Sequence, residues 1–468
     1  MSAPLHPLHA HELRAALVRG AVSAREIAET ALARIAALNA SLGAFTDVTA
    51  ARALAKADEI DARRAQGEAL GALAGAPFAA KNLYDIADLP TRAGSKINRE
   101  RAPARFDATL IARMEAADAI LVGALNMGEY AYDFTGENVH DGPARNPHDP
   151  AHMTGGSSGG SGAAVGGGLV PIALGSDTNG SIRVPAALCG VFGLKPTYGR
   201  LSRAGSFPFV ASLDHLGPFA RSVADLAASY DAMQGADADD PAQSPRPFEP
   251  TVPTLEAGLK SLRIARLGGY FAHGGEPAAH EAVDRVARAL NAERTVEFAE
   301  SERARAAAYL ITMVEGAALH ADRLRARADD FDPAVRDRLI AGAMLPGGWV
   351  VKAQKLRRWY RDRVAEILRE VDVVLAPVTP TRAPLIGQTT FMLDGRDTLV
   401  RPHMGVFTQP ISFIGLPVAA IPMWSEGERL PLGVQIIAAP WREDLVLRIA
   451  RALEREGVAR APIGAAFV

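Results

Sequence analysis

Cysteine is almost absent from this chain of 468 residues, in which Cys189 is the single example. One thiol excludes a disulfide framework and a cluster of thiolate metal ligands, and it is typical of a reducing compartment. Residues 1–20 also lack the apolar run of a secretory signal peptide, because His6, His9, Glu12 and Arg14 interrupt them. We therefore expect a cytoplasmic protein.

Net charge and unbroken apolar runs are scarce as well. The 51 basic and 53 acidic residues leave a net charge of −2, so nothing indicates a nucleic-acid partner. The longest uncharged stretch, residues 153–176, contains nine glycines, four serines and Pro171, which excludes a membrane helix. With 48% hydrophobic residues the chain can still bury a large core, so we expect a globular protein that does not enter a membrane.

Lysine is rare, since only seven of the 51 basic residues are Lys and the other 44 are Arg. One of the seven, Lys81, directly follows the apolar residues 77–80. A buried lysine can lose its proton near neutral pH, whereas arginine cannot. Lys81 is therefore a candidate general base, although a lysine whose ammonium group reaches solvent explains the same residues.

Apolar runs and helical patterns alternate along the chain, which is typical of an α/β fold. Ser23-Ala-Arg-Glu26 has the sequence of a capping box and predicts the start of a helix. Arg-rich amphipathic helices are expected at residues 303–327 and 352–370, with their charges on a solvated face or a subunit contact. Short buried strands are expected at residues 119–125, 170–174, 371–375 and 418–421.

The chain has no apparent internal repeat, so we expect a single domain over residues 1–468. Residues 237–253, rich in Asp and Pro, predict a loop that ends the first half. The expected parts are N-terminal helices at residues 1–60, a catalytic core at about 65–235 and 370–460, and a helical insertion at about 255–370.

Glycine is concentrated in one segment, because 15 of the 43 glycines lie in residues 155–217. The segment begins with Thr154-Gly-Gly-Ser-Ser-Gly-Gly-Ser-Gly162. A phosphate-binding P-loop is excluded, because no lysine occurs between Lys96 and Lys195. A dinucleotide fingerprint and a nucleophile elbow both need a preceding strand, and the two prolines of residues 145–150 argue against one. A flexible linker is disfavoured by the apolar residues that follow.

A second polar piece, Gly175-Ser-Asp-Thr-Asn-Gly-Ser181, follows the expected strand at residues 170–174. Pro185 suits the first turn of a helix, so this piece is expected at a strand-to-helix junction. Backbone N–H groups converge at such a junction and can hold an oxyanion beside a nucleophilic serine. No histidine supplies an evident base, and no Ser-His-Asp order stands out among His140, His148, His152 and His215.

Taken together, these motifs resemble the amidase signature family of Ser-cisSer-Lys hydrolases, over nearly the whole chain. The resemblance implies a large mixed β-sheet covered by helices on both faces, and hydrolysis of amides through an acyl-enzyme. The matching segments are residues 77–81, 91–95, 126–129, 155–161, 175–183, 193–197, 212–218, 415–418 and 432–435.

The resemblance assigns roles residue by residue. It implies Ser181 as the nucleophile, Lys81 as the base, and Ser157 as the bridging serine that follows a cis peptide bond. It implies no metal and no organic cofactor. The oxyanion would be held by the N–H groups of Thr178, Asn179, Gly180 and Ser181.

Three residues depart from the usual family pattern: Asn82, Asp88 and Asn179 stand where Asp, Gly and Gly are common. None removes a catalytic group, and the side chain of Asn179 is a candidate for substrate contact. The expected substrate-binding residues are Asn138, Asn179 and Arg183. Arg92 and Arg203 are further candidates for a cation that holds an anionic substrate.

Within the family, residues 136–143, 177–181, 206–215 and 315–322 are most similar to the catalytic subunits of 1-carboxybiuret hydrolases. This implies release of ammonia from a small carboxylated urea-like amide, a small helical partner subunit, and a homodimer or heterotetramer. The alternatives are a hydrolase of other small amides, carbamates, allophanate or aryl amides, and the glutaminase subunit of a tRNA-dependent amidotransferase. From another class, a non-catalytic nucleotide-binding α/β protein also fits the residues when they are taken alone.

Overall fold

Most strands of the central sheet are short and mainly apolar, so they can be buried between layers of helices. The computed structural model describes residues 5–468; residues 1–4 of the expected N-terminal segment lie outside the described residues. Eleven strands form one mixed sheet in the order β1-β3-β2-β4-β6-β5-β12-β13-β9-β7-β8. Their bounds are β1 Phe45–Val48, β2 Pro77–Lys81, β3 Ile120–Leu125, β4 Ile172–Asp177, β5 Phe192–Lys195, β6 His215–Ala220, β7 Ile264–Leu267, β8 Arg294–Val296, β9 Val373–Pro377, β12 Val418–Met423 and β13 Leu432–Ala438.

Successive residues of the strands point into two different hydrophobic cores, which places helices on both faces of the sheet. In β2, Phe78 and Ala80 belong to the larger core, and Ala79 between them belongs to the smaller one. β4 repeats the pattern, with Ile172 and Leu174 in the larger core and Ala173 in the smaller. The α/β sheet with two helical layers that the sequence predicts is therefore confirmed.

The helices divide between these two cores. The smaller core contains residues of α1 Ala10–Val18, α2 Ala24–Leu42, α3 Ala50–Ala65, α5 Gly159–Gly166 and α6 Arg183–Leu188. The larger core contains residues of α4 Thr109–Ala116, α7 Val223–Met233, α8 Pro277–Ala289, α9 Ser301–Arg327, α10 Pro333–Ala343, α11 Gly347–Glu370, α13 Gln409–Phe413 and α14 Glu443–Arg455.

The predicted capping box begins α2, where Ser23 Oγ accepts a hydrogen bond from Glu26 N at 3.0 Å and Ser23 N donates to the Glu26 carboxylate at 2.8 Å. The two Arg-rich segments form α9 and α11. The four predicted strands correspond to β3, β4, β9 and β12, with ends that differ by up to three residues.

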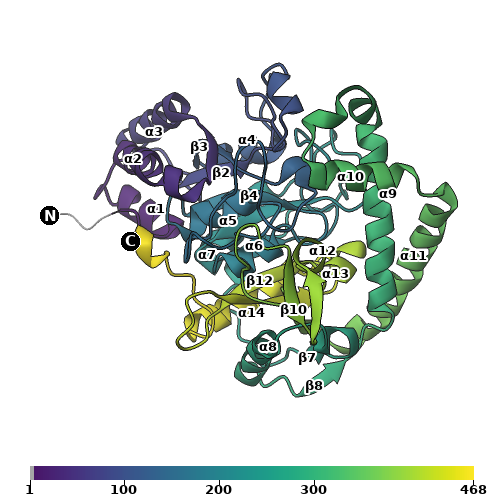
Figure 1. Cartoon of the computed structure of the whole chain (residues 1–468). Coiled ribbons are helices and arrows are strands. Elements are labelled where there is room, and N and C mark those ends of the chain that lie inside the picture. Colours follow the sequence, from purple (N-terminus) through teal and green to yellow (C-terminus); the bar gives the residue numbers. More distant parts are fainter. Residues whose placement is uncertain (1–4) are drawn as a thin grey trace.

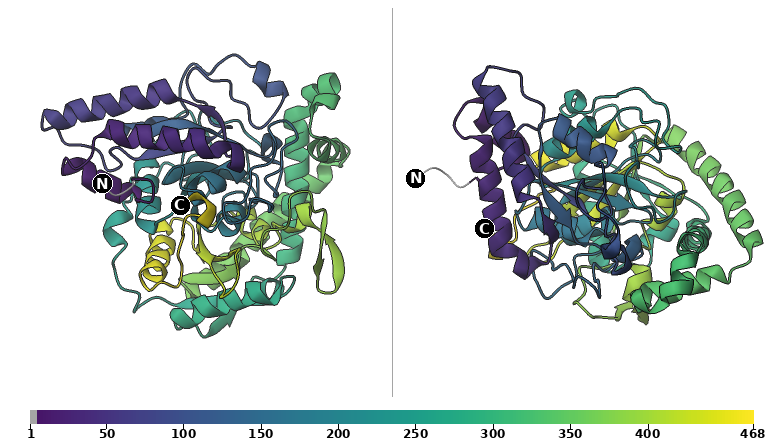
Figure 2. Two further views of the ribbon diagram at one scale, coloured as in Figure 1. Left: turned by 60° about the vertical axis from the view of Figure 1, so that its left-hand side comes forward. Right: turned by 90° about the horizontal axis from the view of Figure 1, so that it is seen from above.

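Helices α9, α10 and α11 stand together beside the sheet, on the right of Figure 1 and again on the right in the view from above in Figure 2. Residues 255–370 also contain β7 and β8, which join the sheet next to β9 because their backbone groups pair in parallel with it and with each other. Within residues 5–468 no helix combines the length and the apolar character needed to cross a membrane.

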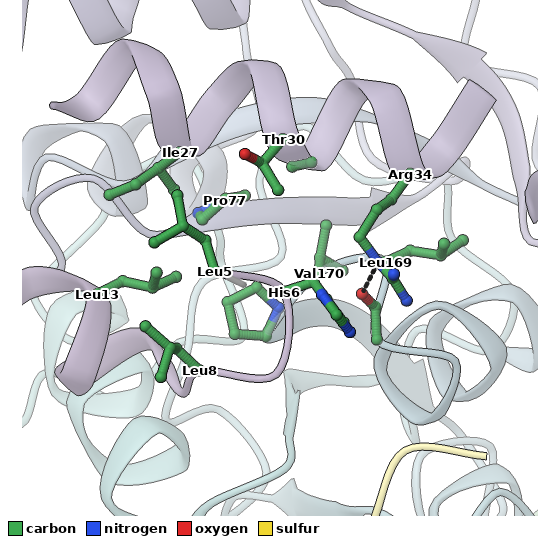
Figure 3. Close-up of a pocket in the computed structure, with 13 residues that line it drawn as sticks. Leu5, His6, Leu8, Leu13, Ile27, Thr30, Arg34, Pro77, Leu169 and Val170 are labelled. Carbon is green, nitrogen blue, oxygen red and sulfur yellow. Dashed lines mark hydrogen bonds between the residues drawn. The ribbon is translucent and has the colours of Figure 1, made fainter. Parts of the chain in front are cut away.

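A two-stranded hairpin and a short helix follow β9 in the chain. The hairpin consists of β10 Thr390–Leu393 and β11 Arg396–Leu399, and α12 Val400–His403 follows it directly. At the other end of the molecule, the residues before α1 close a cavity of about 20 Å³ against α2 and the loop at residues 168–171 (Figure 3). Arg34 Nε donates to Gly168 O at 3.1 Å there, which ties α2 to that loop.

Candidate active site

Lys81 lies at the carboxyl end of β2, between the parallel strands β3 and β4, and its side chain is fully buried. Its Nζ is 2.6 Å from Ser157 Oγ, 2.9 Å from Ser176 Oγ and 3.0 Å from Ser158 Oγ. The ammonium group therefore meets three hydroxyls at hydrogen-bonding distance and no carboxylate within 4.0 Å among residues 5–468.

Burial controls the charge of Lys81. Removal from water lowers the pKa of Lys81 to about 7, although the more distant carboxylates of Asp214, Asp177 and Asp133 oppose this change. At neutral pH a large part of the population thus carries a free amine, which has one lone pair to accept a proton and two N–H groups to donate.

The glycine-rich loop brings Ser157 to Lys81. The Gly156–Ser157 peptide bond is cis, and Ser158 precedes α5. A Cβ on Gly156 would lie 2.4 Å from Asp133 Oδ2 and 2.7 Å from Gly136 N, so close packing requires glycine there. The local excess of glycine therefore serves close backbone packing around Ser157.

Ser181 lies in the loop between β4 and α6, which is wound around the carboxylate of Asp177. Asp177 Oδ2 accepts hydrogen bonds from Ile182 N at 3.2 Å and Arg183 Nε at 2.9 Å. Burial alone would raise the pKa of Asp177, but the charge and hydrogen bonds of Arg183 hold this pKa below its usual range. The carboxylate stays ionised and fixes the loop that carries Ser181.

The residues expected to form the oxyanion hole are held from outside this loop. Thr178 Oγ1 donates to Asp214 at 2.6 Å, and Thr408 Oγ1 donates to Asn179 O at 2.6 Å. Gly180 has φ +143°, and a Cβ there would lie 2.2 Å from Thr408 Oγ1. A side chain at this position would therefore disrupt the peptide groups next to Ser181.

Ser181 opens into an inner cavity of about 20 Å³, which has room for about one water molecule. An outer cavity of about 390 Å³ lies next to it, and the two share Tyr309, Arg338, Arg401 and Pro402. The inner cavity is also lined by Thr178, Asn179, Thr312, Tyr132 and Phe134. A small reacting group can therefore meet Ser181 while the rest of a substrate occupies the outer cavity.

Two of the three expected substrate contacts do not line either cavity. Asn138 donates to Gly94 O at 2.7 Å and Met127 O at 2.8 Å, and its Oδ1 accepts from His140 N and Asp141 N. All four of its hydrogen-bonding positions are used within the protein, so Asn138 shapes the loop after Thr135 rather than facing the cavity.

Arg183 is fully buried and its guanidinium is used internally. It donates to Asp177, to Gln435 Oε1 at 2.7 Å and to Thr408 O at 3.1 Å, and it also contacts Ser412. The further candidates Arg92 and Arg203 are paired with Asp47 and Asp240, each at 2.8–2.9 Å. Of the expected contacts, the structure brings Asn179 to the cavity.

Two arginines that the sequence analysis missed reach the cavities from the second half of the chain. Arg338, on α10, stacks its guanidinium 3.8 Å from the ring centroid of Tyr132 and donates to Ala334 O and Tyr132 O. Arg401, on α12, donates to Asp133 Oδ1 at 2.6 Å and lies 3.5 Å from Glu137. Nothing local distinguishes these two from the other arginines in the sequence.

The residues around the site offer no evident metal centre. Across residues 5–468, no three His, Cys, Asp or Glu side chains converge in a way that could hold a metal ion. The chemistry that the site can perform with its own groups is proton transfer through Lys81 and the hydroxyls around it.

Comparison with known proteins agrees with this arrangement. The family model described as Amidase matches residues 26–447. The chain is 53% identical over 450 residues to the AtzE component of 1-carboxybiuret hydrolase from Pseudomonas sp. (strain ADP), covering 96% of this chain and 98% of that protein. It is 38% identical over 474 residues to a glutamyl-tRNA(Gln) amidotransferase subunit from Anaeromyxobacter sp. (strain K), covering 95% of each.

Solved structures give the same result. One, presented as "an unexpected vestigial protein complex" that reveals the origins of "an s-triazine catabolic enzyme", superimposes with a TM-score of 0.96 at 52% identity, covering 97% of this chain and 100% of that one. A bacterial aryl acylamidase superimposes with a TM-score of 0.88 at 25% identity, covering 97% of each chain. The chain belongs to the amidase signature family and is a hydrolase of amide C–N bonds.

Proposed function

We propose that this hydrolase cleaves a small carboxylated urea-like amide of the 1-carboxybiuret type and releases ammonia. The observation that carries the proposal is the position of Arg338, which lines the same cavity as Ser181 and has no carboxylate within 4.0 Å among the described residues. The 53% identity to a 1-carboxybiuret hydrolase component supports the same substrate class.

In this proposal Lys81, Ser157 and Ser181 carry the reaction. Neutral Lys81 accepts the proton of Ser157 Oγ, and Ser157 accepts the proton of Ser181 Oγ as it attacks the amide carbon. The carbonyl π electrons move to the oxygen, which the N–H groups of residues 178–181 stabilise. When the C–N bond breaks, the relay returns the proton to the leaving nitrogen, and water then hydrolyses the acyl-enzyme.

The hydrogen bonds around Lys81 support its role as the base. Ser158 Oγ donates its own hydrogen to Ser176 O at 3.2 Å, so it can only accept from Lys81. A neutral amine that donates to Ser158 and Ser176 has its lone pair left for Ser157, the nearest of the three hydroxyls. The same hydroxyls also solvate the ammonium form that the relay produces.

The substrate carboxylate is assigned to Arg338 rather than to Arg401. Arg401 is already neutralised by Asp133 and Glu137, which hold it at the boundary between the two cavities. Arg338 has carbonyl and aromatic neighbours, so its charge is available to an anion. Arginine binds carboxylates through paired N–H donors in a favourable planar geometry.

The test measures ammonia release from 1-carboxybiuret and from biuret, which lacks the carboxylate. In Arg338→Met, kcat/KM for 1-carboxybiuret should fall by about 100-fold, the effect of losing a charge-assisted hydrogen bond, while that for biuret changes little. Arg336→Met is the matched control, because Arg336 lies on the same helix and pairs with Asp337. No ammonia from either substrate, or an equal loss on both, would overturn the proposal.

The second candidate is the glutaminase subunit of a tRNA-dependent amidotransferase, supported by the relatives at 38% identity. Glutamine also carries a carboxylate for Arg338, but an aliphatic chain with an α-ammonium group, in place of ureido N–H groups, links this carboxylate to its amide. Glutamine therefore belongs in the same assay. A kcat/KM for glutamine above that for 1-carboxybiuret would replace the first proposal with the second.

We also propose that the chain assembles with a small helical partner subunit, as a homodimer or heterotetramer. Support comes from the relative presented as a protein complex and from apolar side chains exposed on α11 and directly after α10: Met344, Trp349 and Trp359 are 79%, 48% and 42% exposed. Light scattering on the purified chain, alone and co-expressed with a small protein encoded beside its gene, tests this. A monomer in both preparations would contradict the proposal.

A further inference from the structure

Asn179 presents an unsatisfied oxygen at the inner cavity. Its side chain lines the cavity together with Ser181 and Thr312, and the residue is 6% exposed. Its Nδ2 donates to Thr312 Oγ1 at 2.9 Å. Its Oδ1 is buried and has no hydrogen-bond partner among residues 5–468. A buried acceptor without a donor is costly, so this position calls for a donor from a bound molecule.

The orientation of the Asn179 amide is fixed by Thr312. Thr312 Oγ1 uses its one hydrogen on Ala308 O at 2.8 Å, so toward Asn179 it can only accept. A reversed amide would place Asn179 Oδ1 against the lone pairs of that hydroxyl. The main chain of Asn179 is fixed as well, because its carbonyl accepts from Thr408 Oγ1 at 2.6 Å. Asn179 therefore presents its Oδ1 acceptor to the cavity, and its amide cannot reverse to present the Nδ2 donor instead.

We infer that Asn179 Oδ1 accepts a hydrogen bond from the substrate N–H that flanks the scissile carbonyl opposite the leaving amine, so that the site selects ureido groups over alkyl amides. Thr312 is the positioning residue of this contact. The inference rests on the proposed function for its substrate class.

The chemistry of the reaction favours this nitrogen over the leaving one. The leaving nitrogen becomes tetrahedral and takes a proton as the C–N bond breaks, so its N–H directions change during the reaction. The flanking nitrogen remains planar, bonded to the acyl carbon, and keeps its N–H through the acyl-enzyme. A fixed acceptor on the nucleophile loop, two residues before Ser181, can hold such a donor throughout.

Four small substrates separate this inference from the proposed function. Allophanate and malonamate both carry a carboxylate and differ only in N–H against CH₂, and biuret and malonamide differ in the same way without the carboxylate. Within each pair, the ratio of kcat/KM measures selection for the flanking N–H. The ratio of kcat/KM for allophanate to that for biuret, and for malonamate to that for malonamide, measures selection for the carboxylate. Dividing the wild-type ratio by the variant ratio removes the intrinsic reactivity of each substrate.

Asn179→Ala and Thr312→Val should each lower the N–H to CH₂ ratio by about ten-fold, the effect of one neutral hydrogen bond in a buried site. Thr312→Ser keeps the hydroxyl and should keep the ratio. If Asn179→Ala does not fold, the two Thr312 variants still decide the question. An unchanged ratio in Thr312→Val and in any folded Asn179 variant overturns the inference, as does equal loss on both members of a pair. Absence of carboxylate selection overturns the proposed function alone.

Discussion

At the scale of single residues, the site depends on a lysine that is buried without a carboxylate partner. Three hydroxyls around Lys81 Nζ can form hydrogen bonds with both the neutral amine and the ammonium form. Burial lowers the pKa of Lys81 to about 7. A general base works best when its pKa lies near the working pH. Arginine at this position would keep its proton at any accessible pH.

The pH dependence of the reaction follows from this pKa. Because the neutral amine is the active form, kcat/KM should rise about ten-fold per pH unit below pH 7 and become constant above about pH 8. The measurement uses a substrate that does not itself titrate between pH 5.5 and 9. Burial also lowers the pKa of nearby His215 well below its usual value. A flat profile between pH 5.5 and 7 would exclude Lys81 as the base.

The sequence singles out Lys81, Ser157 and Ser181, whose catalytic roles are proposals, but it does not single out the two arginines that line the cavities. Lys81 stands out because lysine is rare, and Ser157 and Ser181 lie within the dense glycine segment. Arg338 and Arg401 are two of 44 arginines and reach the cavities only through the packing of α10 and α12. Arg183 is close to Ser181 in the sequence but does not line either cavity, because sequence distance does not give side-chain direction.

At the scale of elements, the chain positions Ser157 by packing peptide groups too closely for side chains. The loop before α5 packs directly against Asp133 and Gly136. In α5, a Cβ built on Gly160 would lie 2.5 Å from Asn126 O and 2.6 Å from Ala44 O. Backbone segments can approach one another this closely only where both are held rigidly. The two hydrophobic cores, one on each face of the sheet, hold them in place.

Gly156→Ala tests this packing. The added Cβ would lie 2.4 Å from Asp133 Oδ2 and 2.7 Å from Gly136 N, so the loop must move. We expect the free energy of unfolding to fall by about 1–3 kcal/mol, as in other overpacked cores, and kcat to fall as Ser157 leaves Lys81. Gly258→Ala is the control, since nothing lies within 4 Å of its Cβ. Equal stability and activity in the two variants would contradict the argument.

Sequence patterns predicted the buried elements better than the exposed ones. β3, β9 and β12 consist of apolar residues, and so does β4 up to Gly175, so burial accounts for these strands. β8, with the sequence Arg-Thr-Val, and the exposed β10–β11 hairpin contain polar residues whose pattern fits a loop equally well. They form strands because a neighbouring strand supplies hydrogen-bond partners, which a local pattern cannot reveal.

At the scale of the whole molecule, the sheet joins the part of the first half that carries Ser181 to the second half of the chain. β12 from the second half pairs with β5 from the first, and the order of strands places β13 next to it. Arg183 makes a second connection between the halves through hydrogen bonds. Its guanidinium binds Asp177 of the first half. It also donates to Thr408, Ser412 and Gln435 of the second half. The hydrogen bonds of Arg183 therefore tie the loop that carries Ser181 to the second half of the chain.

Arg183→Met should consequently destabilise the fold rather than alter substrate binding. It leaves the carboxylate of Asp177 buried without its cationic partner, so we expect the free energy of unfolding to fall by about 3–5 kcal/mol, measured by urea denaturation. Arg325→Met, which breaks an exposed pair with Asp322, should change it by less than about 1 kcal/mol. Below the melting temperature, the folded fraction of Arg183→Met should keep the wild-type preference for carboxylated substrates, because that arginine does not line either cavity. A variant with wild-type stability that loses the preference would instead return Arg183 to the role of anion receptor.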